Sequence, residues 1–238
     1  MEKSNIDEKI KLLTGSGMWH TQEEEGLPSV HLSDGPHGLR KQEEKERQNN
    51  VSLVSTCYPT ASALACSWDV TAAERLGRAV AKEAWNADVS VLLGPGINMK
   101  RSPLCGRNFE YFSEDPFLAG RLGAAYVSAA QGEDVAVSLK HFAANNQETN
   151  RQTANSQIDE RALREIYLSA FEYVVKTARP ATVMASYNRL NGYYACENRH
   201  LLTEILREEW GFDGVVISDW GACADLAKAV KAGMDLEM

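Results

Sequence analysis

Several features that would define a protein class are missing from this 238-residue sequence. The five cysteines include no Cys-x-x-Cys pair, which argues against both a disulfide framework and a zinc ribbon. The five histidines show no helix-spaced ligand pair, so we expect no metal site. The glycines form no Gly-x-Gly-x-x-Gly motif, so we expect no dinucleotide and no other cofactor.

Long apolar runs and basic stripes are missing as well. The amino terminus lacks the apolar stretch of a signal peptide, and no run of about eighteen apolar residues occurs later. We therefore expect a cytoplasmic protein that does not bind a membrane. The formal net charge of −8, with no Lys/Arg-rich stripe, argues against nucleic acid as a partner. A neutral or cationic substrate fits this charge better.

What the sequence does contain is a repeated unit of strand, polar loop and helix. Buried strands are expected at residues 29–33, 89–93, 135–139, 181–185 and 215–218. Helices are expected at residues 71–87, 115–132, 159–178, 198–210 and 222–232. This alternation, without a dinucleotide fingerprint, favours an α/β protein with one (β/α) barrel domain over residues 1–238 rather than a doubly wound sheet.

Other segments give weaker local signals. Residues 41–52 carry mixed charge without periodic apolar positions, which predicts a mobile, solvated loop. The small apolar residues of 58–68 suggest a short strand. Thr71-Ala-Ala-Glu74 predicts a capping box for the helix that follows. Residues 234–238 resemble the start of a final strand.

The segment 211–221 carries the clearest functional signal. Four residues of buried-strand character, 215–218, stop at Asp219 and Trp220. Ligands of parallel α/β proteins bind at the carboxyl ends of strands, so Asp219 is a candidate nucleophile or base. An alternative is that Asp219 caps the helix expected to begin near Ala222.

Polar residues also follow other strands. Asp34 and Arg40 flank the turn-rich segment after the first strand, although Asp34 alone could be a simple turn former. Lys140 and His141 come directly after the third. Adjacent strand residues point to opposite faces, so both reach one site only if the strand ends or bulges there.

Two further features point to the same edge of the sheet. Tyr187 follows the strand 181–185 and could donate to a ligand or merely pack. In the long loop 97–114, charged residues alternate with aromatic ones, a composition that suits a polyhydroxylated ligand because ring faces cover C–H surfaces. A surface cluster of salt bridges is an equally good interpretation of this loop.

Taken together, these motifs resemble the barrel domain of family 3 glycoside hydrolases, the β-glucosidase group, over nearly the whole chain. The motifs are Ser33-Asp-Gly-Pro-His-Gly-Leu-Arg40, Gly106-Arg-Asn-Phe-Glu110 with Ser113-Glu-Asp-Pro116, Lys140-His-Phe-Ala-Ala-Asn145, Ser186-Tyr-Asn-Arg-Leu-Asn-Gly192, Ser218-Asp-Trp220 and Gly233-Met-Asp-Leu-Glu237. Several such motifs in the right order are highly specific. The resemblance implies a (β/α)8-type TIM barrel.

The resemblance also implies a role for each strand-end residue. Asp219 would be the nucleophile of a retaining mechanism that hydrolyses β-glucosides or small oligosaccharides. Neighbouring cations, Lys140 and Arg107, are expected to lower its pKa. The residues implied to bind the sugar are Asp34, Arg40, Arg107, Lys140, His141, Met184, Tyr187 and Trp220.

The sequence departs from the family at its carboxyl end. Retention needs a second carboxyl about 5 to 5.5 Å from the nucleophile. In the β-glucosidase type, the resemblance places that glutamate in a downstream α/β sandwich domain, which is missing here together with the last barrel helix. We therefore expect impaired turnover in isolation, and either self-association or a partner chain that supplies the missing domain.

The remaining acidic residues do not suggest a substitute. The hexosaminidase branch of the family uses an Asp-His pair in the loop after the Lys-His motif, but this loop reads Asn145-Asn-Gln-Glu148. Glu110, Glu114 and Glu148 are expected to support the site rather than to replace the acid.

Two rival functions are compatible with parts of the sequence. A non-catalytic sugar-binding barrel would share every feature except the acid. A Schiff-base aldolase could use Lys140 at a strand end as its amine nucleophile, but it would leave Asp219, Trp220 and Arg107 unexplained.

Overall fold

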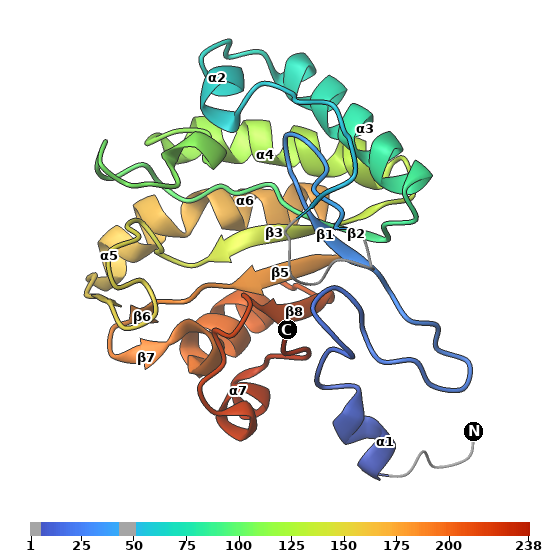
Figure 1. Cartoon of the computed structure of the whole chain (residues 1–238). Coiled ribbons are helices and arrows are strands. Elements are labelled where there is room, and N and C mark those ends of the chain that lie inside the picture. Colours follow the sequence, from blue (N-terminus) through green and yellow to red (C-terminus); the bar gives the residue numbers. More distant parts are fainter. Residues whose placement is uncertain (1–5, 43–50) are drawn as a thin grey trace.

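The computed structural model describes residues 6–42 and 51–238 (Figure 1). Most of the segment 41–52, interpreted above as a solvated loop, lies outside these residues. Among the described residues, no helix combines the length and the apolar character needed to cross a membrane.

A parallel sheet of five strands forms the centre of the molecule. Its order is β1 (Leu32–Asp34), β2 (Val91–Leu93), β3 (Ala136–Phe142), β5 (Thr182–Ala185) and β8 (Val215–Ser218). All four pairings are parallel. The α/β class is confirmed, and every strand runs in the direction that brings its polar end to one edge.

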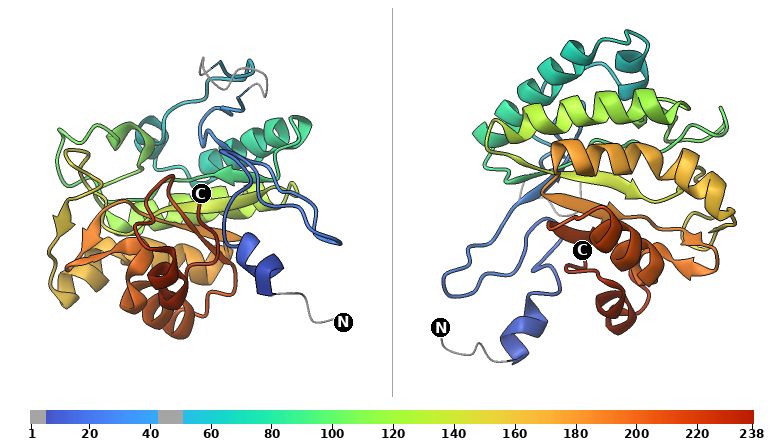
Figure 2. Two further views of the ribbon diagram at one scale, coloured as in Figure 1. Left: turned by 60° about the horizontal axis from the view of Figure 1, so that its bottom comes forward. Right: turned by 180° about the vertical axis from the view of Figure 1, so that it is seen from behind.

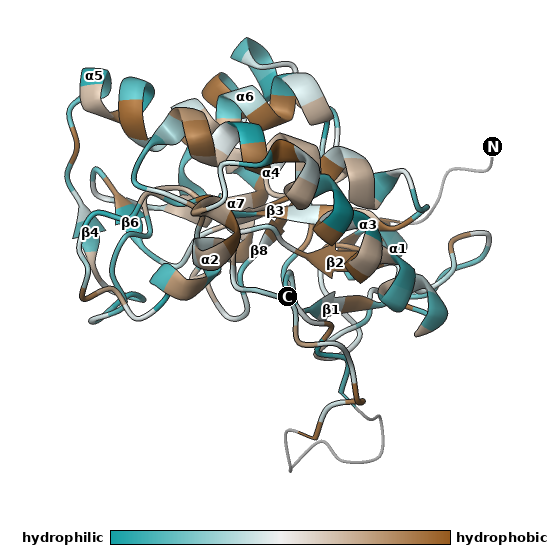
Figure 3. Cartoon of the chain, turned by 90° about the horizontal axis from the view of Figure 1, so that it is seen from above, coloured by the Kyte–Doolittle hydropathy of each residue, from teal (hydrophilic) through white to brown (hydrophobic). Residues whose placement is uncertain are grey.

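Helices cover the outer side of this sheet. They are α3 (Val70–Asn86), α4 (Pro116–Gln131), α6 (Ser169–Ala178) and the π-helix η4 (His200–Glu209). In Figure 2, α3, α4 and α6 lie side by side, and Figure 3 shows a brown, apolar β2 next to helices that carry both brown and teal stretches. Burial of the apolar helix faces against the strands forms the main core.

Single-residue bridges continue the sheet from β8 back to β1. Leu236 pairs with Ile217, Glu237 pairs with Thr14, and the amino-terminal hairpin then leads from residues 14–15 through residues 20–21 to His31, just before β1. The interior of this ring holds a small apolar cluster. Its members are Leu32, Val91, Leu93, Met184, Ile217 and Leu236. The hairpin therefore takes the place of further βα repeats, and residues 235–237 take the position of the expected final strand.

The remaining elements are short. They are α1 (Ile6–Lys11), α2 (Ala61–Ala65), η1 (Asn108–Glu110), β4 (Asn155–Ser156), α5 (Glu160–Ala162), η2 (Leu163–Tyr167), β6 (Arg189–Leu190), β7 (Tyr193–Tyr194), η3 (Ala195–Glu197) and α7 (Leu226–Ala232). The expected helix 159–178 is thus divided into α5, the π-helix η2 and α6.

Two local predictions were wrong. Residues 58–68 contain the helix α2 instead of a strand, because Thr60 accepts a hydrogen bond from the Ala63 N–H and the small residues after it are good helix formers. The helix α3 is capped by Asp69, which accepts from the Thr71 N–H, so Thr71 lies inside the helix and not at its cap.

We expect the substitution Gly77→Ala to destabilise the protein. Alanine gains about 1 kcal/mol of helix propensity, but its Cβ would lie 2.5 Å from the Tyr126 backbone oxygen, where α3 meets α4. Overpacking costs about 1–3 kcal/mol, so the clash outweighs the propensity. Urea unfolding measures the difference. Gly120→Ala in α4 is the control, because its Cβ meets neighbours at an ordinary 3.4 Å and should be neutral or stabilising.

Candidate active site

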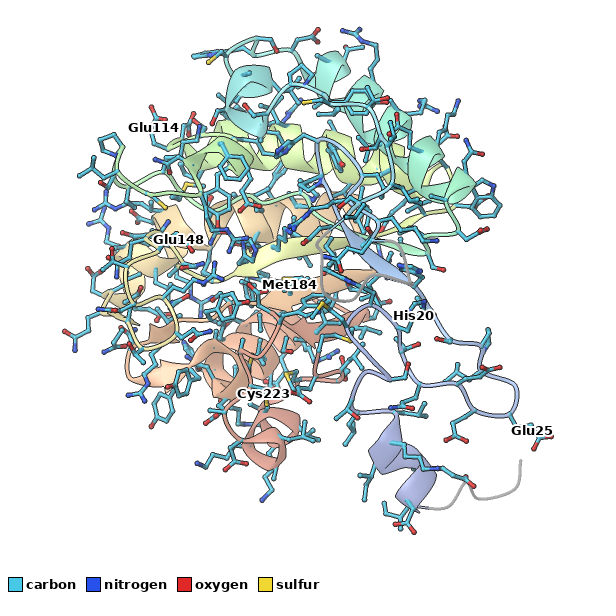
Figure 4. The ribbon with its side chains drawn as sticks, in the orientation of Figure 1. His20, Glu25, Glu114, Glu148, Met184 and Cys223 are labelled. Carbon is cyan, nitrogen blue, oxygen red and sulfur yellow. The ribbon has the colours of Figure 1, made fainter. Side chains whose placement is uncertain are left out.

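A cavity of about 270 Å³ opens at the carboxyl ends of the strands. All nine residues singled out from the sequence line it: Asp34, Arg40, Arg107, Lys140, His141, Met184, Tyr187, Asp219 and Trp220. The sequence reasoning did not select three further lining residues: Trp19, Gln42 and Arg151. Figure 4 labels Met184 of β5 near the centre of the molecule, with the exposed Glu114 far from it.

Asp219 follows β8 and is 7% exposed. Its Oδ1 accepts a hydrogen bond from the Trp220 N–H at 2.9 Å. Its Oδ2 is buried and has no hydrogen-bond partner in the described part of the chain. The helix-cap alternative is wrong, because α7 begins at Leu226 and is capped by Asp225. Asp219 therefore presents its carboxyl at the cavity, with Oδ2 free of a close hydrogen bond and the Tyr187 hydroxyl beside it.

The pKa of Asp219 reflects two opposed effects. Burial raises the pKa, whereas the charges of Lys140 and Arg107 and the hydrogen bonds from the Trp220 N–H and the Tyr187 hydroxyl lower it. Burial outweighs the others, so the net shift is upward. The two cations lower the pKa, as the sequence predicted, but the net shift is opposite to that expectation because the sequence did not reveal how deeply the carboxyl is buried.

His141 is held in a fixed orientation by its neighbours. Asn98 donates to its carbonyl at 2.8 Å and accepts from its N–H at 2.7 Å. The Arg107 guanidinium lies 2.7 Å from Nε2, and the Tyr111 hydroxyl 3.1 Å from Nδ1. A guanidinium only donates, so Nε2 accepts and the proton of the neutral ring is on Nδ1.

The charge of the His141 ring decides whether its contact with Asp219 is an ion pair. Burial lowers the pKa of His141, and the nearby cations Arg107, Lys140 and Arg151 lower it further. The ring is therefore neutral at pH 7. Its Nε2 lies 3.7 Å from Oδ2 of Asp219, but because the ring carries no charge this contact is not an ion pair.

Lys140 reaches the same cavity as His141 because β3 is irregular there. The register with β5 shifts between Leu139 and Phe142, which is the bulge that the adjacent pair requires. The ammonium of Lys140, with a side chain only 5% exposed, lies 3.4 Å from Oδ1 of Asp34. This pair places one carboxylate and one cation on the cavity wall.

Arg107 and Glu110 form an ion pair in the loop 97–114. Both side chains are largely buried, at 17% and 8% exposure, so this part of the loop is not a surface salt-bridge cluster. Burial alone would lower the pKa of Arg107, but the neighbouring Tyr111 and Glu110 raise it. The NH1 group of Arg107 is buried without a hydrogen-bond partner among the described residues.

Aromatic rings form the rim of the cavity. The indoles of Trp19 and Trp220 lie 5.2 Å apart between centroids. Trp19 donates to Gln42 at 3.0 Å and Trp220 donates to the Met18 carbonyl at 2.6 Å, so both indole N–H groups are already engaged. Each indole therefore offers a ligand mainly its apolar surface.

Arg151 also lines the cavity. Its guanidinium lies 4.3 Å from the centroid of the Tyr187 ring and donates to Glu148 at 2.8 Å. Burial and the charge of Asp219 raise the pKa of Tyr187, so its hydroxyl keeps its proton and can donate. The pairing of Glu148 with Arg151 agrees with a supporting role for this glutamate.

In the described part of the chain, no cluster of three or more His, Cys, Asp or Glu side chains could hold a metal ion. The cavity instead combines the buried Asp219 carboxylate, a second carboxylate paired to lysine, buried cations and indole faces. This set of groups suits a neutral ligand that offers many hydroxyl groups and C–H surfaces.

Parallel strands covered by helices, with a polar cavity at their carboxyl ends, place the chain among the (β/α)-barrel domains. Residues 35–238 match the family model described as the glycosyl hydrolase family 3 N terminal domain. The chain belongs to this family.

Similar proteins support the assignment over the whole chain. The chain is 53% identical to a thermostable beta-glucosidase B of Acetivibrio thermocellus, covering 100% of this chain and 32% of that protein. It is 50% identical to an exo-alpha-(1->6)-L-arabinopyranosidase of Bifidobacterium longum, covering 98% and 31%. The beta-glucosidase 3B of Thermotoga neapolitana, solved in complex with glucose, superposes with a TM-score of 0.93 at 43% identity, covering 98% and 35%. The chain thus spans about a third of the length of these relatives.

We expect the reactivity of Asp219 toward an activated glycoside to fall in acid. If Asp219 is the nucleophile, the attacking group is its carboxylate, and the raised pKa places the acid limb above the pH range in which an exposed aspartate titrates, about 3.9. In Lys140→Met, a charge that lowers this pKa is lost, so the limb should move to higher pH. The pH profile of the glycosylation rate measures the shift.

Lys82→Met is the control, because this exposed lysine lies outside the cavity, and it should leave the acid limb of the profile in place. A move of the acid limb to lower pH in Lys140→Met would contradict the role of Lys140 in lowering the pKa of Asp219.

Proposed function

We propose that this chain is the nucleophile-bearing barrel of a retaining glycoside hydrolase that acts on β-glucosides. The observation that carries the proposal is the Asp219 carboxylate, buried at the strand-end cavity beside two cations and the Tyr187 hydroxyl. The names of several relatives, which are beta-glucosidases, support glucose as the sugar.

In this mechanism the sugar at the nonreducing end occupies the cavity. Lys140 and Asp34, paired at 3.4 Å, exchange part of their contact for hydrogen bonds to sugar hydroxyls, and the free NH1 of Arg107 offers a further donor. Asp219 Oδ2 forms a bond to the anomeric carbon while the bond to the leaving oxygen breaks. Water then cleaves the glycosyl ester with a second inversion, which gives net retention.

The leaving oxygen needs a proton, and the described cavity offers no suitable acid. Its carboxylates are Asp34 and Asp219 alone among the described lining residues, and Asp34 is paired with Lys140. Glu110 and Glu148 are paired with arginines. We infer that the acid comes from outside the described residues, either from another segment or from a partner chain, and that turnover of ordinary glucosides depends on it.

An activated substrate separates the nucleophile from the acid. 2,4-Dinitrophenyl 2-deoxy-2-fluoro-β-D-glucoside has a leaving group that needs no protonation, and its fluorine slows the breakdown of the ester. We expect one 2-fluoroglucosyl adduct per chain by intact mass spectrometry, located on the peptide that contains Asp219. A folded chain that stays unlabelled, or that carries the label elsewhere, would favour a non-catalytic sugar-binding barrel.

The Schiff-base alternative is tested in parallel. The nitrogen of Lys140 is held 3.4 Å from the Asp34 carboxylate, so it is engaged in an ion pair rather than free to attack a carbonyl carbon. Borohydride reduction in the presence of a carbonyl substrate should therefore leave the mass of the chain unchanged. A stable adduct at Lys140 would revive this function.

A further inference from the structure

A second cavity, beside an exposed tryptophan, lies at the other end of the barrel. Trp85 is 60% exposed and, with Asn86, ends α3. Together with Lys82 and the loop of Glu133 and Asp134, it lines a cavity of about 450 Å³. These loops precede β2 and β3, so the cavity lies at the amino ends of the strands, opposite the candidate active site.

Buried residues and ion pairs hold this cavity in shape. Val89 and Val135, at 2% and 1% exposure, anchor the two loops in the core. Glu133 accepts from Arg78 at 2.8 Å and lies 3.8 Å from Lys82, which ties the loop after α4 to α3. The groups that face the cavity are thus positioned before any ligand arrives, which lowers the entropic cost of binding.

Three polar or aromatic groups at this cavity are not used by the fold. Within residues 6–42 and 51–238, the amide of Asn86, the carboxylate of Asp134 and the indole N–H of Trp85 make no hydrogen bond or ion pair. An amide and a carboxylate supply donors and acceptors, and the indole supplies an apolar face. The volume falls within the range of about 300 to 1,000 Å³ that is common for small-molecule sites.

The charges around the cavity select among ligand classes. The charges of the lining largely cancel, because Lys82 is offset by Asp134 and Glu133 is paired with Arg78. Neither a cationic nor an anionic ligand gains a net electrostatic advantage, which leaves a neutral molecule with vicinal hydroxyl groups and C–H faces. It can exchange hydrogen bonds with Asn86 and Asp134 while it stacks on Trp85.

We propose that the Trp85 cavity binds sugar units of a neutral β-glucan chain, and so holds a polymeric substrate at a distance from the cleavage site. The proposal rests on the proposed function only for the choice of a β-glucan as ligand. Binding at this cavity needs neither Asp219 nor an acid from outside the described residues.

Affinity electrophoresis in native gels that contain soluble barley β-glucan tests the proposal. The wild-type chain should be retarded, and Trp85→Ala should bind roughly tenfold more weakly, as expected for the loss of one well-packed aromatic contact. Trp68→Ala is the matched control, because Trp68 is 78% exposed but lines none of the described cavities and should keep wild-type retardation. Circular dichroism checks that each variant is folded.

Two further measurements separate this site from the active site. Trp85→Ala should be labelled at Asp219 by the fluoroglucoside at the wild-type rate. If the gel no longer retards Asp34→Ala but still retards Trp85→Ala, the glucan binds at the strand-end cavity and the proposal is overturned. Equal losses in Trp68→Ala and Trp85→Ala would overturn it as well. The two proposals can also fail separately. If β-glucan retards the wild-type chain but not Trp85→Ala, and the fluoroglucoside never labels Asp219, the glucan site is supported and the nucleophilic role of Asp219 is refuted.

Discussion

Asp219→Asn is expected to slow glycosylation by 2,4-dinitrophenyl β-D-glucoside by roughly 10⁴-fold or more. The amide that replaces Oδ2 lacks both the negative charge and the nucleophilicity of the carboxylate. The amide oxygen can still accept from the Trp220 N–H as Oδ1 does, at 2.9 Å, so the loop geometry should persist. Stopped-flow measurement of dinitrophenolate release gives the rate constant.

Chemical rescue distinguishes a lost nucleophile from a damaged site. In Asp219→Gly the space vacated by the carboxylate can admit azide, which should restore dinitrophenolate release and give a glucosyl azide of inverted configuration. Cys223→Ser, in the same loop but outside the cavity, should react at the wild-type rate. A rate within tenfold of wild type in Asp219→Asn would remove this residue from the mechanism.

The sequence was sufficient to predict the strands and the edge at which polar residues gather. Buried strands are short apolar runs, and the residues after them are visible in the sequence as abrupt changes of polarity, as at Asp219. Local rules failed where two signals competed. At residues 58–68 a small-residue helix resembles a strand, and at α3 the cap is Asp69 although Thr71 and Glu74 satisfy the capping-box spacing.

The missed cavity residues reach the site through tertiary structure. Trp19 belongs to the hairpin that connects residues 235–237 to β1, a closure made of isolated bridges that no periodic pattern reveals. Arg151 is placed by its stacking on Tyr187, a contact between two loops. The upward shift in the pKa of Asp219 depends on burial by distant segments, so nearby cations in the sequence gave only part of the answer.

The buried pair of Arg107 and Glu110 should separate stability from reactivity. In Glu110→Leu the guanidinium of Arg107, 17% exposed, loses its bound carboxylate. Removing one partner of a buried pair costs about 3–5 kcal/mol because the other charge stays desolvated, and partial exposure of Arg107 places the expected loss near the lower value, about 3 kcal/mol. Urea unfolding of Glu110→Leu against wild type measures it.

The double variant Arg107→Met/Glu110→Leu should recover most of that stability, because replacing both members of a buried pair by apolar residues of similar size is often neutral or better. It should still be labelled roughly 10²-fold more slowly than wild type, since it lacks the donor proposed to bind the sugar and a cation that favours the ionised Asp219. Arg161→Met/Glu165→Leu, an exposed pair, is the matched control and should change neither quantity appreciably. If Arg107→Met/Glu110→Leu is labelled at the wild-type rate, Arg107 serves the fold alone. If it stays as unstable as Glu110→Leu, the cost comes from the packing of loop 97–114 and not from an uncompensated charge.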